Sequence, residues 1–130
     1  MKNYRPPCKS CLWVLDMASK HFADSEFACQ CGCGMCIINT ELVGVLEFIR
    51  ARFMRPVHIL SGNRCPSHNI ECGGVEDSQH LLGTAADIYV DGIPIESIAK
   101  AAEMAKADGI GKYATFCHVD VRGEYARWDG

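Results

Sequence analysis

Two stretches, Ser78-Gln-His80-Leu-Leu-Gly83-Thr-Ala-Ala-Asp87 and Cys117-His118-Val-Asp120-Val-Arg122, set imidazole and carboxylate groups in apolar, strand-like sequence. Alternation of side chains predicts a strand in each stretch, with one apolar face. Asp87 falls on the opposite face of the first strand, and His118 and Asp120 fall on the opposite face of the second. Burying a polar group without a partner costs roughly 2–7 kcal/mol, so these side chains need hydrogen bonds or a metal.

His80, Asp87 and His118 together form a set of two histidines and one carboxylate. This composition is typical of a catalytic zinc ion whose fourth position is open to water. A single histidine or aspartate in a strand is more often a hydrogen-bonded structural residue, and the spacing His-x6-Asp alone is a weak signal. The metal site therefore depends on the sequence around it.

The surrounding pattern is longer and more specific. Ser61-Gly-Asn-Arg64-Cys-Pro-x-His68-Asn69 and Gly73-Gly74 precede the first stretch. With Ser78-x-His80-x-x-Gly83-x-Ala-Ala-Asp87 and His118-Val-Asp120, they resemble the zinc D-Ala-D-Ala carboxypeptidase family, of the peptidase M15 type. Its wider superfamily includes lysostaphin-type endopeptidases and the hedgehog signalling domain. The resemblance runs from about His21 to Trp128, and the phage and prophage branch of single-domain enzymes is the most similar.

The resemblance implies an α+β fold, with a small antiparallel sheet and flanking helices. It also implies that His80, Asp87 and His118 are the zinc ligands. An arginine sixteen residues before the first zinc histidine holds the carboxylate end of the substrate in this family, and Arg64 occupies that place. A guanidinium suits the task because it stays charged and binds carboxylates through two parallel hydrogen bonds. Ser78 either donates a hydrogen bond to the substrate or closes the turn.

The chain departs from the better-known members at the general base. Those members have an acidic residue three positions before the last zinc histidine, where this chain has Thr115, followed by Phe116. Asp120 shares a strand face with His118, so we predict that it takes the proton from the attacking water. Two alternatives for Asp120 are that it orients a metal ligand or pairs with Arg122 or Arg127.

The spacing predicts a zinc hydrolase site, and the resemblance implies a zinc peptidase that hydrolyses D-Ala-containing bonds of peptidoglycan stem peptides. It would act as a carboxypeptidase or an endopeptidase, and an endolysin-like role in a phage would fit. The rival hypothesis is a zinc-bearing binding or structural module on the same scaffold, which the missing acid at Thr115 favours. A peptidase that acts on a peptide outside the cell wall is a third possibility.

Length and composition are consistent with one domain. The 130 residues divide into a cysteine-rich segment, 1–36, and a catalytic core, 37–130. A net charge of −3 and a pI near 5.9 argue against nucleic-acid binding. No apolar run approaches the ~20 residues of a membrane helix, and the first residues lack a signal-peptide core. We expect a monomer that is made in the cytoplasm and reaches the wall through phage lysis or a virion.

Nine cysteines are many for this length, and an odd number cannot all pair. Reduced thiols or metal ligands are therefore more plausible than a framework of disulfides. The pairs Cys8-x-x-Cys11 and Cys33-x-x-Cys36 predict a second, structural zinc site, with Cys29 and Cys31 as competing ligands. The other hypothesis is free, partly buried thiols, to which we assign Cys65, Cys72 and Cys117.

The remaining chain predicts ordinary elements. A helix from Glu41 to about Phe53 is capped by Asn39 or Thr40 and has one apolar stripe. Further elements are a strand at 57–60, a loop at 66–74, a helix at 95–107 and an edge strand or strap at 122–128. His21 is predicted to be structural.

Overall fold

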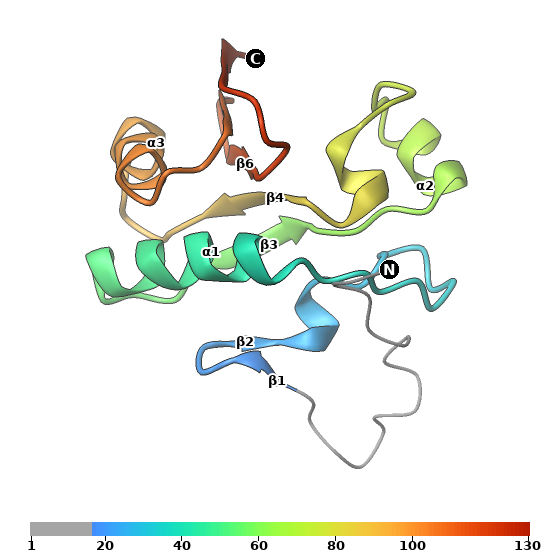
Figure 1. Cartoon of the computed structure of the whole chain (residues 1–130), viewed down its shortest axis with the longest axis horizontal. Coiled ribbons are helices and arrows are strands. Elements are labelled where there is room, and N and C mark those ends of the chain that lie inside the picture. The colour runs from blue at the N-terminus through green and yellow to red at the C-terminus, as the bar shows by residue number, and fades with distance from the viewer. Residues whose placement is uncertain (1–16) are drawn as a thin grey trace.

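A five-stranded sheet forms the centre of the protein in a computed structural model, which describes residues 17–130 (Figure 1). The strand order is β3-β4-β6-β5-β7, and every neighbouring pair is antiparallel except β5 and β7, which are parallel. The strands are β3 (His58–Ser61), β4 (Ala85–Tyr89), β5 (Gly109–Lys112), β6 (Cys117–Asp120) and β7 (Ala126–Asp129). The α+β class is confirmed, although the sheet is mixed rather than wholly antiparallel.

In residues 17–130, three α-helices and two short 3-10 helices complete the fold, and a small hairpin precedes them. The α-helices are α1 (Thr40–Phe53), α2 (Pro66–Glu71) and α3 (Ile95–Met104). The hairpin joins β1 (Met17–Ser19) and β2 (Phe22–Ala23), and the 3-10 helices are η2 (Asp24–Glu26) and η3 (Gln79–Leu82). In Figure 1, α1 crosses in front of β3, while α2 and α3 lie at opposite ends of β4. No helix among the described residues is long and apolar enough to cross a membrane.

Alternation along β4 and β6 separates the hydrophobic core from the polar face, as predicted. Ala86 and Ile88 of β4 and Cys117 and Val119 of β6 are buried in the main apolar cluster together with α1 and α3. Side chains of the intervening residues point to the other face, because successive residues of a strand alternate. This second face carries the polar groups of both strands.

The predicted helix ends are close to the observed ones for physical reasons. The side chain of Asn39 accepts hydrogen bonds from the backbone N–H groups of Glu41 and Leu42, which makes it the cap of α1. The helix ends at Met54, whose φ of 52° is left-handed, before Pro56 is reached. The predicted edge strand is β7.

The prediction of a loop at 66–74 is wrong for its first six residues. Residues Pro66–Glu71 form α2, with the proline in the first turn, where its missing N–H costs no hydrogen bond. The Sγ of Cys65 accepts the N–H of His68 and caps this helix. Cysteine is not a usual cap residue, so the helix start had no clear signal in the sequence.

Candidate metal centre

Pairing of β4 with β6 brings two of the predicted ligands together. Asp87 and His118 are direct partners in the antiparallel ladder. His80 comes from η3, just before β4, and all three side chains are buried. One ligand atom of each residue lies within 4.8 Å of the other two. We call this group the His-Asp-His site.

The facing atoms of this site are all suited to accept a positive charge. Oδ1 of Asp87 lies 3.2 Å from Nε2 of His80 and 3.0 Å from Nδ1 of His118. Tetrahedral zinc with bonds of about 2.0–2.1 Å separates its nitrogen and oxygen ligands by about 3.3 Å. The carboxylate oxygen therefore lies at a distance from each histidine nitrogen that is close to the separation of zinc ligands.

Hydrogen bonds behind each ligand fix which atom faces the site. Nδ1 of His80 lies 2.8 Å from the carbonyl oxygen of Gly62, which can only accept, so this nitrogen carries the proton and Nε2 is left as a lone-pair donor to a metal. Nε2 of His118 lies 2.7 Å from Oδ2 of Asp120, which leaves Nδ1 toward the site. Such carbonyl and carboxylate partners commonly orient metal-binding histidines.

Arg64 provides the same support for the carboxylate ligand. Its Nη2 donates to Oδ2 of Asp87 at 3.1 Å, so Oδ1 is directed toward the histidines. Its Nη1 and Nε donate to the side chains of Asn69 and Ser61, at 3.2 and 2.9 Å. The three nitrogens of the guanidinium thus each hold a neighbouring side chain.

The surroundings of Asp87 and Asp120 favour the charged form of both carboxylates. Burial raises the pKa of Asp87, but hydrogen bonds with His118 and His80 outweigh it and bring that pKa to about 2. Burial also raises the pKa of Asp120, yet His118 and Arg122 hold it well below its usual range. The pKa of His118 is raised, because its bonds to the two carboxylates outweigh the effect of burial.

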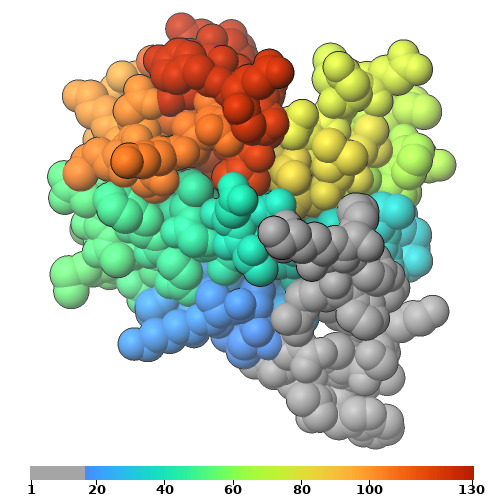
Figure 2. Space-filling model, in the orientation of Figure 1, coloured from blue at the N-terminus to red at the C-terminus, as the bar shows by residue number. Residues whose placement is uncertain are grey.

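The His-Asp-His site lies in a cleft of about 440 Å³. A notch in Figure 2 separates the red C-terminal segment from the yellow segment near residue 80, and these segments supply opposite walls of the cleft. Arg64 and Ser78 line it together with Arg122, which the sequence suggested only as a partner of Asp120. The walls also contain residues that the sequence did not single out: Asp77, Tyr113 and Trp128. Trp128 donates from Nε1 to the Tyr113 hydroxyl at 2.9 Å, a contact without a local sequence signal.

Asp120 and Ser78 occupy positions that bear on their predicted roles. Asp120 is completely buried on the far side of the His118 ring, where both of its oxygens also accept from Arg122. The oxygen of Ser78 accepts the N–H of His80 at 3.2 Å, which closes the turn into η3. His21, predicted to be structural, lies with Nδ1 2.6 Å from Glu47 Oε1.

The second predicted metal site differs from the arrangement in the structure. Cys8 and Cys11 lie outside the described residues. Cys36, another predicted ligand, is buried with its Sγ 3.4 Å from the carbonyl oxygen of Asp24, and it does not belong to the cysteine group that the described residues form. That group contains Cys33, which was a predicted ligand, and Cys29 and Cys31, which were the competing ligands. Its fourth member is Cys65, which was expected to be a free thiol.

Comparison with known families agrees with this geometry. A family model described as Peptidase M15 matches residues 20–120. The chain belongs to the peptidase M15 family. The match includes the whole His-Asp-His site and all of the cysteine group, so both lie within the M15 domain.

The curated relatives of this M15 chain considered below are both named as peptidoglycan L,D-endopeptidases. Peptidoglycan L,D-endopeptidase MepK of Escherichia coli (strain K12) is 35% identical over 81 residues, which cover 57% of this chain and 44% of the relative. The probable peptidoglycan L,D-endopeptidase MepK of Haemophilus influenzae is 31% identical over 81 residues, covering 57% and 43%. The chain spans less than half the length of these relatives.

Proposed function

We propose that this M15 protein is a zinc-dependent peptidase that hydrolyses peptide bonds in peptidoglycan stem peptides. The observation that carries the proposal is the convergence of three buried acceptor atoms, from His80, Asp87 and His118, on one point in a cleft. The similarity to peptidoglycan endopeptidases supports the substrate class.

The residues of the site fit a zinc ion in number, type and spacing. His80 Nε2, Asp87 Oδ1 and His118 Nδ1 would hold it. When bound, zinc supplies a Lewis acid that polarises a carbonyl group and lowers the pKa of a bound water to about 7. The protein contributes rigid placement: the Gly62 carbonyl, Arg64 and Asp120 each hold one ligand from behind.

From the sequence, Asp120 is predicted to be the general base that takes the proton from the attacking water. Its oxygens accept from His118 and Arg122, and its carboxylate is completely buried. These contacts support the alternative role, in which Asp120 orients the His118 ring. We therefore infer that Asp120 is a positioning residue for His118.

The bonding of Arg64 bears on which bond is cleaved. A carboxypeptidase needs a cationic group free to bind the terminal carboxylate of its substrate. Arg64 already holds Asp87, Asn69 and Ser61, and its side chain is 12% exposed. This supports cleavage of an internal bond, as the names of the relatives suggest, over the release of a terminal D-Ala.

Digestion of purified muropeptides tests the function and identifies the bond. Pentapeptide monomers and the cross-linked dimers are incubated with the zinc-loaded protein and analysed by mass spectrometry. We expect products of internal cleavage, and no release of a single alanine from the pentapeptide monomer. Release of D-Ala alone would identify a carboxypeptidase. Absence of product from every muropeptide would favour the zinc-bearing binding module.

A further inference from the structure

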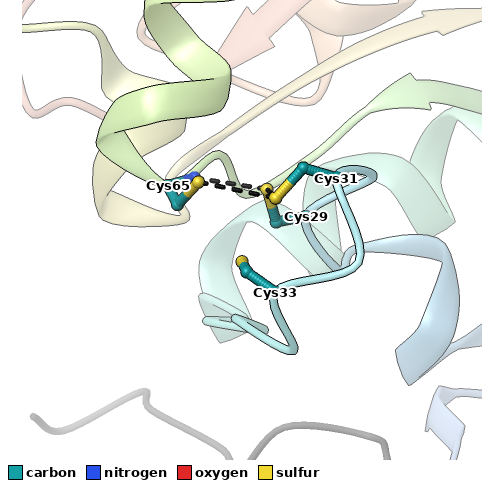
Figure 3. Close-up of side chains that lie close together, drawn as sticks. All are labelled: Cys29, Cys31, Cys33 and Cys65. Atoms are coloured by element: carbon teal, nitrogen blue, oxygen red, sulfur yellow. Dashed lines mark hydrogen bonds between the residues drawn. The ribbon is translucent and has the colours of Figure 1, made fainter.

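Four cysteine sulfur atoms meet at a place separate from the His-Asp-His site (Figure 3). The four Sγ atoms all lie within 4.8 Å of one another. We call this group, Cys29, Cys31, Cys33 and Cys65, the cysteine cluster. Three members come from the loop that follows η2, and the fourth lies directly before α2.

The sulfur separations are those of metal ligands rather than of disulfides. The Sγ of Cys31 lies 3.5 Å from that of Cys29 and 3.6 Å from that of Cys65. A disulfide requires about 2.05 Å. Tetrahedral zinc with Zn–S bonds of about 2.3 Å places its sulfur ligands about 3.8 Å apart. The observed separations are within a few tenths of an ångström of that value.

Backbone groups around the cluster direct hydrogen atoms at the sulfurs. The N–H of Cys65 donates to Cys29 Sγ at 3.3 Å, and the N–H of Met35 donates to Cys33 Sγ at 3.4 Å. The sulfur of Cys65 accepts the N–H of His68 at 3.4 Å. A sulfur that accepts N–H groups is in the bonding role of a thiolate, which is the form that binds metals.

Local chain geometry allows three cysteines in five residues to point the same way. Gly32, between Cys31 and Cys33, has a φ of 85°. This is a left-handed backbone conformation that residues other than glycine rarely adopt. The carbonyl of Met35 accepts the N–H of Cys29 at 2.8 Å and closes this loop on itself. The conformation of this loop therefore brings its three cysteine side chains together.

We propose that the cysteine cluster binds one zinc ion with a structural role. Four thiolates select a thiophilic ion in tetrahedral geometry, and a site with four protein ligands leaves no position for a substrate. The metal would join the loop at 29–33 to the residue that follows Arg64. Since Arg64 holds Asp87, this zinc fixes one wall of the cleft without taking part in the chemistry.

Metal analysis of single variants tests the assignment. Protein purified under reducing conditions is expected to hold about two zinc equivalents per chain, one at each site. Cys65→Ser should lose about one equivalent, and His80→Ala should lose the other. The matched control is Cys72→Ser, because Cys72 is exposed and lies outside the cluster. It should keep both.

Spectroscopy with cobalt distinguishes the two sites without relying on zinc content. Cobalt bound by thiolates gives an intense near-ultraviolet charge-transfer band, which a site of nitrogen and oxygen ligands lacks. We expect this band in His80→Ala and in the double variant Cys8→Ser, Cys11→Ser, and its loss in Cys65→Ser. Loss of the band in the Cys8, Cys11 double variant would overturn the choice of ligands.

Alkylation of the unsubstituted protein keeps the proposal falsifiable if Cys65→Ser fails to fold. Cys31 and Cys33 are exposed, as is Cys72, so iodoacetamide can reach all three, and removal of zinc with a chelator should raise the rates at Cys31 and Cys33 but not at Cys72. In zinc-loaded protein we expect Cys72 to react at least tenfold faster than the two cluster cysteines. Equal rates at the three cysteines in zinc-loaded protein would overturn the proposal. So would disulfides among the four cysteines that persist after purification under reducing conditions, or iron bound in place of zinc.

Discussion

The carboxylate of Asp120 lies behind the ring of His118, with Oδ2 2.7 Å from Nε2, while the other ring nitrogen faces Asp87. Space for this carboxylate is provided by Gly109, its partner across the β5–β6 ladder. A Cβ atom at position 109 would lie 2.2 Å from the same oxygen. Thus a glycine in one strand makes room for the carboxylate that holds the His118 ring in the next.

Asp120→Asn separates orientation of the ligand from proton transfer. An amide cannot hold the His118 ring and Arg122 as a carboxylate does, so we expect zinc affinity to fall by about 10- to 100-fold. Activity should return when zinc is supplied in excess. The measurement is a zinc titration against a competing chelator, alongside turnover. Full zinc affinity with a turnover loss of about 100-fold or more would instead identify Asp120 as the general base.

Gly109→Ala should disturb the same carboxylate from the opposite strand. Because the added methyl group would overlap Asp120, we expect the free energy of unfolding to fall by about 1–3 kcal/mol and zinc binding to weaken. Gly44→Ala is the control, since a Cβ there meets nothing within 4 Å in the middle of α1. It should raise stability by about 0.5–1 kcal/mol. Chemical denaturation measures both, and unchanged zinc affinity in Gly109→Ala would contradict the account.

Arg64→Lys tests whether the guanidinium supports Asp87 or binds the substrate. Lysine keeps the charge but cannot hold Asp87 and Asn69 with one rigid fork. We expect kcat and zinc affinity to fall, with KM little changed. Peptides ending in a carboxylate and in an amide should be affected equally. A rise in KM confined to the peptide with a free carboxylate would show that Arg64 is a carboxylate clamp.

Glu47 gives the protein a pH-dependent contribution to stability away from the cleft. Burial raises the pKa of Glu47, but hydrogen bonds from Ser19 and His21 outweigh it and lower that pKa. A carboxyl with a lowered pKa stabilises the fold above its unfolded value of about 4.3, and this contribution disappears as the pH falls through the folded value.

Glu47→Gln should therefore cost up to about 1 kcal/mol at pH 7, because the hydrogen bonds to the Glu47 carboxylate are partly exposed. The difference between the two proteins should shrink below about pH 4. Urea denaturation at several pH values measures it. A difference that is constant from pH 7 to pH 3 would show that the charge of Glu47 contributes nothing.

Most of the fold could be predicted from local patterns, and the grouping of His80, Asp87 and His118 from these patterns together with the family resemblance. Alternation placed Asp87 and His118 on the polar faces of β4 and β6, and the ladder makes them direct partners. The cap at Asn39 marked the start of α1. These features depend on residues close together in the chain, where spacing determines geometry.

The cysteine cluster and the role of Arg64 depend on contacts that spacing does not reveal. Cys65 meets Cys31 across a sequence separation of 34 residues, and nothing near Cys65 marks it as a partner. Arg64 has the spacing of a carboxylate clamp, yet its fork is occupied by Asp87, 23 residues along the chain. Such long-range pairs are fixed by how the loops fold over the sheet.

The most direct test of the central claim is turnover of purified muropeptide dimers by chelator-treated protein, before and after zinc is added back. We expect no product without zinc, full recovery with it, and no recovery in His80→Ala, whose ligand set is incomplete. Retention of the thiolate–cobalt band in that variant would show that it is folded. Product formation by His80→Ala at the wild-type rate, or by the chelated protein without zinc, would contradict the assignment of the His-Asp-His site as the catalytic centre.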